Sequence, residues 1–149
     1  MDKISEFDGE YAWLSNFWPS VIMVDVIEYP TVEHAFQAAK VLDLKLRKAI
    51  SLLDTPGEAK HVGNKVRLRE DWETVKVAIM YDLLCKKFED LWLRDRLIET
   101  ESLYLEEGNT WKDRIWGVYP PNSGNGRNLL GELLMMVRYF IIGGKQCLN

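Results

Sequence analysis

Apolar residues recur with a helical period along most of this 149-residue chain. The pattern predicts a first helix over residues 32–42, a short helix after Thr55, a long helix from Glu70 and a last helix from Leu129. Residues 91–100 continue the long helix or form one of their own. Helices therefore account for most of the predicted secondary structure.

Capping residues mark two of the helix starts. Thr31 directly precedes the first helix, while Thr55, Pro56 and Glu58 form a capping box with proline in the first helical position. A threonine oxygen at the N-cap accepts a hydrogen bond from an N–H of the first turn, which has no partner within the helix. We therefore expect both helices to begin directly after their threonines.

The residues before the first helix combine β-prone and turn-forming sequences. Residues 21–24 are Val-Ile-Met-Val, and turn-forming pairs occupy positions 8–9 and 18–19. We predict two or three short strands here, and a short strand with a turn over residues 102–109. The expected fold class is a mainly α, multihelical single domain over residues 1–149 with a small N-terminal β element.

The composition is that of an ordinary globular chain, with 47% hydrophobic and 28% charged residues and a net charge of −4. The acidic balance argues against a broad, nonspecific nucleic-acid surface. The first ten residues lack the apolar core of a signal peptide, and no run approaches membrane-spanning length. We expect a cytoplasmic protein with no membrane partner, whose cysteines, Cys85 and Cys147, are thiols rather than a disulfide.

The first helix places three polar side chains along the edge of its apolar face. Glu33, Gln37 and Lys40 follow one another at i, i+4 and i+7, so they lie on one line. A row of an acid, an amide and an amine beside an apolar stripe is typical of a pocket wall. The simpler interpretation of Glu33 is an exposed first-turn acid that the helix dipole stabilises.

Trp72 lies among charged residues near the start of the long helix. Its indole could serve as a flat platform for a heterocycle, and such stacking contributes roughly 1–3 kcal/mol per base. The commoner structural role is an aromatic side chain at the edge of the core.

The segment before the last helix combines an acid with a glycine-rich loop. Asp113 lies just before Trp116-Gly117, where a β-edge or a tight turn would aim its carboxylate inward. Residues 124–128 open the last helix, so we expect free backbone N–H groups and the positive helix end to converge there on a phosphate-sized anion. The alternative is a plain turn with a helix cap.

Metal or cofactor chemistry has little support in the sequence. His34 and His61 have no partner at metal-ligand spacing, and no cluster of Cys, His and Asp is visible. We expect a site without metal or cofactor, built from two carboxylates, an indole and an anion-binding backbone.

Five segments together resemble the NADAR superfamily, also called the YbiA-like or riboflavin-intermediate N-glycosidase family. The combination of EHxFQAxK with a downstream GxNxLGxLLMxVR carries the resemblance, which spans nearly the whole chain. The matching segments are "LSNFWP" (14–19), "YPTVEHAFQAAK" (29–40), "PGEAKHVGNKVRLREDWETVK" (56–76), "KDRIWG" (112–117) and "GNGRNLLGELLMMVR" (124–138).

The resemblance implies a YbiA-like fold and hydrolysis of an N-glycosidic bond between a ribose and a base or amine. Family substrates include ribosylamino-pyrimidine phosphates of riboflavin synthesis. The family's site positions fall on Glu33, Trp72 and Asp113, which we assign as the catalytic set. Asp113 is expected to activate water and Glu33 to stabilise the sugar, or the two roles are exchanged.

A second group of residues is expected to bind the substrate and its phosphate. Its members come from the first, second and fifth matching segments: Asn16, Gln37, Lys40, Gly124, Gly126, Arg127 and Asn128. Between the conserved Trp-Gly and Gly124 this chain has residues 118–123, where members of the riboflavin branch often continue with a sequence such as WGDGG. This longer, proline-containing loop predicts a differently shaped substrate mouth.

Two alternatives stay open. The first is removal of ADP-ribose from guanine in nucleic acid, in defence or phage counter-defence, for which the densest basic run is Lys60, Lys65, Arg67 and Arg69. Nucleic acid would then be a partner only as the ADP-ribosylated substrate. The second is a non-catalytic module that binds NAD or ADP-ribose, although binding alone has little use for paired acids.

Overall fold

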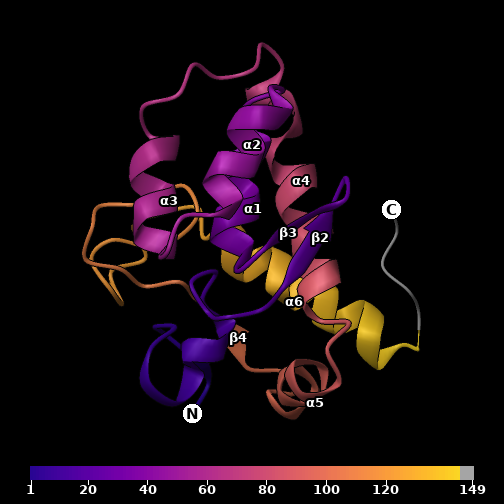
Figure 1. Ribbon diagram of the computed structural model, residues 1–149. Helices are drawn as coiled ribbons and strands as arrows, with labels where there is room; N and C mark the ends of the chain where they lie inside the picture. The colour runs from indigo at the N-terminus through magenta and orange to yellow at the C-terminus, as the bar shows by residue number, and fades with distance from the viewer. Residues whose placement is uncertain (145–149) are drawn as a thin grey trace. The chain divides into compact units, whose positions relative to one another are not determined.

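The computed structural model describes residues 1–144 of the chain, which form two compact units. One unit comprises Asn16–Lys87, and the other combines Met1–Ser15 with the residues from Phe88 onward (Figure 1). Helices dominate both units, so the predicted mainly helical fold class is confirmed. The assignment of residues 1–149 to one domain stays a prediction.

The unit of residues 16–87 is built around helix α1. A two-stranded antiparallel hairpin precedes α1, and three further helices pack against it (Figure 1). The elements of this unit are β2 (Ile22–Val24), β3 (Ile27–Tyr29), α1 (Val32–Ala39), α2 (Leu44–Ser51), α3 (Pro56–Gly63) and α4 (Trp72–Lys87).

The central position of α1 buries polar as well as apolar residues. Every residue from Val32 to Ala38 is buried, although Glu33, His34 and Gln37 are polar. Buried polar groups need hydrogen-bond partners, and His34 bonds through Nε2 to the carbonyl oxygen of Leu53 at 2.9 Å. The simple picture of an exposed first-turn acid at Glu33 is therefore wrong.

The predicted helix starts are present. The Thr31 hydroxyl oxygen accepts from the N–H of His34 at 3.1 Å, and the Thr55 oxygen accepts from the N–H of Glu58 at the same distance. The Glu58 carboxylate accepts a hydrogen bond from the backbone N–H of Asp54, the residue before the N-cap, at 3.2 Å.

Several boundaries differ from the prediction. Helix α1 ends at Ala39 rather than residue 42, and α4 begins at Trp72 rather than Glu70. Helix α2 was not predicted, because only part of one face is buried. The Asp43 carboxylate caps this helix by accepting hydrogen bonds from the backbone N–H groups of Lys45 and Leu46.

The other unit joins the two ends of the chain. Strand β1 (Lys3–Ile4) pairs in parallel with β4 (Tyr104–Leu105), with Lys3 opposite Tyr104 and Ile4 opposite Leu105. The unit also contains the 3-10 helix η1 (Gly9–Leu14), the helix α5 (Leu91–Glu99) and the helix α6 (Leu129–Ile142).

This unit also corrects two sequence expectations. Residues 9–14 form a 3-10 helix where turns and strands were expected. The helical period from Leu129 also places Met136 on the apolar face of the last helix, whereas the residue is 47% exposed. The buried residues of α6 include Leu130, Leu134 and Val137.

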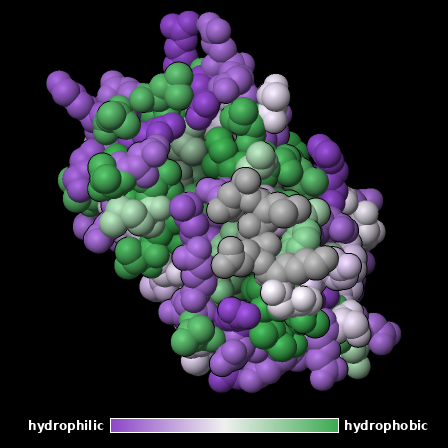
Figure 2. Space-filling view, turned by 90° about the vertical axis from the view of Figure 1, so that its right-hand side faces the viewer, coloured by the Kyte–Doolittle hydropathy of each residue, from purple (hydrophilic) through white to green (hydrophobic). Residues whose placement is uncertain are grey.

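Cys85 is disulfide-bonded, so the expectation that it is a thiol is wrong. Cys147 lies outside the described residues. Among the helices of residues 1–144, none combines the length and the apolar character that crossing a membrane requires. On the face shown in Figure 2, hydrophilic and hydrophobic residues are interspersed.

Candidate active site

The predicted polar row on α1 exists as a chain of contacts. Glu33 is 8% and Gln37 is 4% exposed, and Gln37 Nε2 donates to Glu33 Oε1 at 2.7 Å. One turn further along, Lys40 Nζ donates to the carbonyl oxygen of Gly63 at 3.4 Å. An acid, an amide and an amine therefore lie side by side, as the helical spacing predicted.

Asn16 joins this row at the start of α1. Its carbonyl oxygen accepts from the backbone N–H of Glu33 at 3.1 Å, and its side-chain Nδ2 lies 3.5 Å from the sulfur of Met80. The residue is 8% exposed, and its Oδ1 has no partner among the described residues. The unit thus brings together four of the predicted site residues, Asn16, Glu33, Gln37 and Lys40.

The environment of the row acts on the charge of Lys40. Partial burial lowers the pKa of the ammonium group because the charged form loses solvation. The Glu33 carboxylate acts in the opposite direction, and Lys60 lowers the pKa further. Lys40 and Glu33 are therefore electrostatically coupled.

Gly63, at the end of α3, contacts the row and was not predicted from the sequence. A Cβ atom at this position would lie 1.8 Å from Gln37 Oε1, so the side-chain amide packs directly on the glycine. A glycine at the end of a short helix is usually explained as a terminating residue, which conceals a packing role. Only the approach of α3 to α1 shows why the position has no side chain.

Trp72 is placed at the edge of the core. It is 5% exposed, and its ring centroid lies 5.0 Å from that of Phe36 at an interplanar angle of 53°. This geometry agrees with the structural alternative for the indole and leaves little of its surface for a base. Stacking on substrate stays a prediction.

Two cavities among the described residues of this unit lie away from the row. One of about 420 Å³ is lined by Ala35 and Ala39 of α1 and by Val75 and Ile79 of α4. These two alanines lie on the side of α1 opposite Glu33, Gln37 and Lys40.

Asp113 belongs to the other unit and lies in the loop between β4 and α6. Its Oδ1 accepts from the backbone N–H groups of Ile115 and Trp116, both at 2.9 Å. The buried side chain of Asn109 holds the main chain on both sides: Oδ1 accepts from the N–H of Asp113 at 3.0 Å, and Nδ2 donates to its carbonyl oxygen at 2.8 Å. The carboxylate is therefore fixed in direction by its own backbone.

The expectation of free N–H groups at the start of α6 is wrong. The N–H groups around that helix start donate to carbonyl oxygens of the segment that follows Asp113. The pairs are Arg127 to Arg114 (2.8 Å), Asn128 to Gly117 (3.3 Å), Leu129 to Ile115 (3.2 Å) and Leu130 to Trp116 (3.0 Å). Because the loop folds back and occupies these donors itself, they are not available to an anion.

Gly126 shows how closely this loop is packed. Its φ is +151°, and a Cβ atom there would lie 2.2 Å from the carbonyl oxygen of Gly117. Gly124 has a φ of +73° and is exposed, with no atom near its missing side chain. Phosphate binding by the backbone of residues 124–126 and by the exposed side chain of Arg127 stays a prediction.

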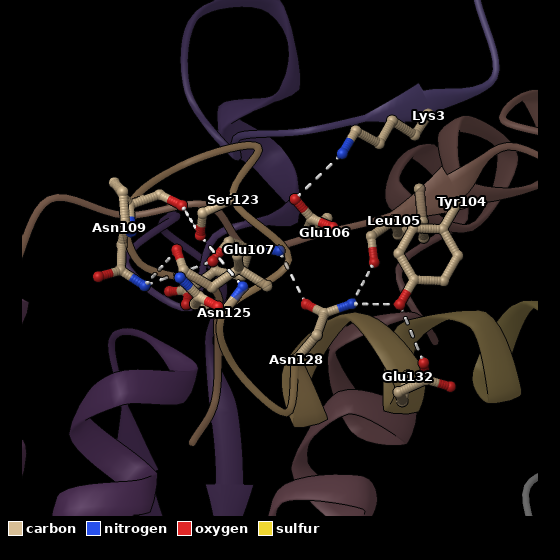
Figure 3. A network of polar contacts seen from close by, with 12 residues as sticks. Lys3, Tyr104, Leu105, Glu106, Glu107, Asn109, Ser123, Asn125, Asn128 and Glu132 are labelled. Carbon is tan, nitrogen blue, oxygen red and sulfur yellow. Dashed lines mark hydrogen bonds and ion pairs between the residues drawn. The ribbon is translucent and has the colours of Figure 1, made fainter. Parts of the chain in front are cut away.

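The side-chain amide of Asn128 already bonds to other groups of the protein (Figure 3). Its Oδ1 accepts from the N–H of Glu107 at 2.9 Å, while Nδ2 donates to the carbonyl oxygen of Leu105 at 2.9 Å and contacts the Tyr104 hydroxyl at 3.3 Å. The residue is 2% exposed with a φ of +51°. Its amide thus ties α6 to strand β4 rather than pointing at solvent.

In the basic run of the nucleic-acid alternative, Arg69 is engaged within the protein. Its Nε and Nη2 donate to the two carboxylate oxygens of Asp71 at 2.6 and 3.1 Å, and this pairing raises the pKa of Arg69. A paired guanidinium is less available for phosphate contacts.

Comparison with known proteins gives a consistent result. The NADAR domain family matches residues 4–142. N-glycosidase YbiA of Escherichia coli (strain K12) is 41% identical over 134 residues, which cover 87% of this chain and 81% of that protein. The NMR structure of E. coli YbiA aligns with a TM-score of 0.82 at 36% identity, covering 96% of this chain and 87% of that one.

A longer relative connects the family with a pathway. Riboflavin biosynthesis protein VVA0006 of Vibrio vulnificus (strain YJ016) is 32% identical over 136 residues, which are 89% of this chain but 36% of that protein. The family match over nearly the whole chain confirms the resemblance seen in the sequence motifs. The chain therefore belongs to the NADAR family and is an enzyme of the N-glycosidase type.

Proposed function

We propose that the enzyme hydrolyses the ribosyl C–N bond of a phosphorylated riboside, such as a ribosylamino-pyrimidine phosphate of riboflavin synthesis. The observation that carries this proposal is the buried Glu33 carboxylate, held by an amide donor beside a lysine. The similarity to N-glycosidases and to a riboflavin biosynthesis protein supports the substrate class.

Two carboxylates suit this reaction. Cleavage of a ribosyl C–N bond builds positive charge on the sugar, and a nearby carboxylate stabilises that charge. A second carboxylate orients or deprotonates the attacking water. We assign stabilisation of the sugar cation to Glu33 and activation of the attacking water to Asp113. An exchange of these two roles is the alternative within the same mechanism.

The fixed direction of the Asp113 carboxylate supports its assignment to water. Two backbone N–H groups bind Oδ1, which leaves Oδ2 as the oxygen for a further partner. A carboxylate held in one direction orients water at a smaller entropic cost than a freely rotating one. Trp72 would complete the catalytic set by excluding water next to Phe36.

Charged side chains supply the proposed phosphate site. Lys40 lies one turn beyond Gln37 on the same line, and Arg127 is exposed in the loop before α6. Asn16 and the backbone of residues 124–126 are assigned to the rest of the substrate. This arrangement predicts tighter binding of the phosphorylated than of the unphosphorylated riboside, and a cytoplasmic enzyme that needs no metal or cofactor.

The test is hydrolysis of the ribosylamino-pyrimidine phosphate by the Glu33→Gln and Asp113→Asn variants. We expect each change to lower kcat/KM by at least 100-fold, or about 2.7 kcal/mol of transition-state stabilisation. Glu28→Gln, an exposed glutamate of β3, is the matched control and should retain full activity. Variants that stay within threefold of the parent would reject the assignment.

The substrate class is tested in the same assay. The unphosphorylated riboside, NAD and guanine-ADP-ribosylated DNA are offered in parallel, with released product identified by mass spectrometry. We expect turnover of the phosphorylated riboside at the highest kcat/KM. Faster turnover of the ADP-ribosylated DNA would replace this proposal with the nucleic-acid alternative.

A further inference from the structure

Gln37 lies between Glu33 on its own helix and Gly63 at the end of α3. Its Nε2 donates to Glu33 Oε1 at 2.7 Å, and its Oε1 lies against Gly63. At 4% exposure the side chain has almost no contact with solvent. Both ends of the amide are therefore in contact with protein.

The hydrogen bond to Glu33 fixes the orientation of the amide. The NH₂ end of Gln37 is its only donor, so this end faces the accepting oxygen of Glu33. The carbonyl end then points to α3, where Oε1 has no hydrogen-bond partner among the described residues. A buried acceptor without a partner is costly, which indicates that the bond to Glu33 determines this arrangement.

The Gln37 amide packs directly against Gly63. A Cβ atom there would lie 1.8 Å from Oε1, 2.6 Å from Cδ and 3.0 Å from Cβ of Gln37. Even alanine would therefore displace the whole end of this side chain. Because Gly63 also accepts from Lys40, the end of α3 contacts the two residues that follow Glu33 along the row.

We propose that Gln37 is a positioning residue that, braced by Gly63, sets the direction of the Glu33 carboxylate and favours its ionised form. Its amide serves the enzyme rather than the ribose or the phosphate, in contrast to its assignment from sequence. The inference rests on the proposed function, in which Glu33 is a catalytic carboxylate. It adds Gly63 and reassigns Gln37.

The two residues act on Glu33 through one contact, so their substitutions should not be additive. In Gly63→Ala the new methyl group displaces the amide and releases the carboxylate. In Gln37→Ala the amide is absent, so the methyl group meets only Cβ of residue 37, at 3.0 Å, and a shift of a few tenths of an ångström relieves that contact. The double variant should therefore behave like Gln37→Ala alone.

The experiment measures kcat and KM of these three variants with the ribosylamino-pyrimidine phosphate. We expect at least a tenfold fall in kcat for Gly63→Ala and for Gln37→Ala, with KM changed by less than threefold. The double variant should lie within threefold of Gln37→Ala. Gly57→Ala is the matched control on the same helix, because its new Cβ would meet only the Thr55 hydroxyl oxygen, at 3.9 Å.

The pH profile gives a readout that a purely structural role would not change. Gln37→Glu places a second carboxyl group beside Glu33, and such a pair holds a proton to higher pH. The acid limb of kcat should therefore move up by at least one pH unit, while in Gln37→Met, which lacks the donor, kcat should fall at all pH values.

Several outcomes would overturn the proposal. They are a rise in KM with unchanged kcat in the Gln37 variants, losses that multiply in the double variant, or an unmoved acid limb in Gln37→Glu. If Glu33→Gln is inactive while the Gln37 variants are normal, the positioning role alone fails. If Glu33→Gln is fully active, the proposed function fails, and the positioning role fails with it.

Discussion

The two proposed carboxylates are held in different ways. Glu33 lies on a regular helix, and the side chain of Gln37 on the next turn contacts its carboxylate. Asp113 lies in a loop, and backbone N–H groups two and three residues further along bind its carboxylate. The helical residue thus depends on side-chain packing, whereas the loop residue depends on main-chain hydrogen bonds.

This difference determines what each region tolerates. In the helix, backbone hydrogen bonds are made within the element, so a lost side-chain contact changes the direction of one group. In the loop, the same segment holds both the fold and the carboxylate. Ile115 and Trp116 bind Asp113 through their N–H groups, and the carbonyl oxygens of residues 114–117 accept the N–H groups at the start of α6. We therefore expect activity and stability to separate around Glu33 and to change together around Asp113.

Replacement of Asn109 should have the largest effect on stability. The buried amide binds both the N–H and the carbonyl oxygen of Asp113 and lies 3.3 Å from the carbonyl oxygen of Val118. Asn109→Ala removes the partners of the N–H and the carbonyl oxygen of Asp113, so we expect a loss of about 3 kcal/mol in the free energy of unfolding. Urea denaturation measures it, and kcat should fall in parallel.

Asn125→Ala is the control for this prediction, because Asn125 is exposed in the same loop. It should lie within about 0.5 kcal/mol of the parent. An Asn109→Ala protein with parental stability and activity would contradict the view that one amide supports both the loop and Asp113.

The two units also differ in how they bury a cation. Arg138, 7% exposed, donates through Nη1 to the Thr100 hydroxyl and to the carbonyl oxygen of Leu103, both at 2.9 Å. Lys87, at the end of α4, is 1% exposed, and desolvation lowers the pKa of its ammonium group to about 7. In the unfolded chain a lysine keeps its proton until the pH approaches about 10.4.

Between these pKa values the unfolded chain binds the additional proton, so stability rises with pH. We expect the contribution of Lys87 to increase the free energy of unfolding by about 2 kcal/mol from pH 7 to pH 9. Urea denaturation across this range measures the slope. Lys87→Met should lack this increase, whereas Lys86→Met should retain it; equal slopes in the parent and in Lys87→Met would contradict the assignment.

Loss of the cap of α1 should have the smallest effect of the three. Thr31 accepts from the N–H of His34, and its hydroxyl contacts His34 Nδ1 at 2.8 Å. Thr31→Val should cost about 1 kcal/mol in the free energy of unfolding, as an N-cap typically does. It should leave kcat within twofold, since the contact of Gln37 with Glu33 lies one turn further along.

Thermal denaturation and steady-state kinetics check this prediction, with Thr31→Ser as the control that retains the hydroxyl. A large loss of kcat at nearly unchanged stability would show that the helix start itself positions Glu33. The contrast between the helix and the loop would then no longer hold.

The sequence alone located most of the helices and the polar row on α1. Apolar period and capping residues predicted α1, α3, α4 and α6, and the same period aligned Glu33, Gln37 and Lys40. These features depend on residues within four positions of one another, so local geometry is sufficient to infer them. Helix α2 was missed because its apolar face is only partly buried.

Tertiary structure decided the features that join distant segments. The parallel pairing of β1 with β4, the carbonyl groups of residues 114–117 at the start of α6, and the missing side chain of Gly63 all depend on chain segments that meet only after folding. Their hydrogen bonds and steric contacts leave no periodic trace in the sequence. For this reason the sequence predicted which residues carry charge in the site, whereas the fold determines which of those groups already have a partner.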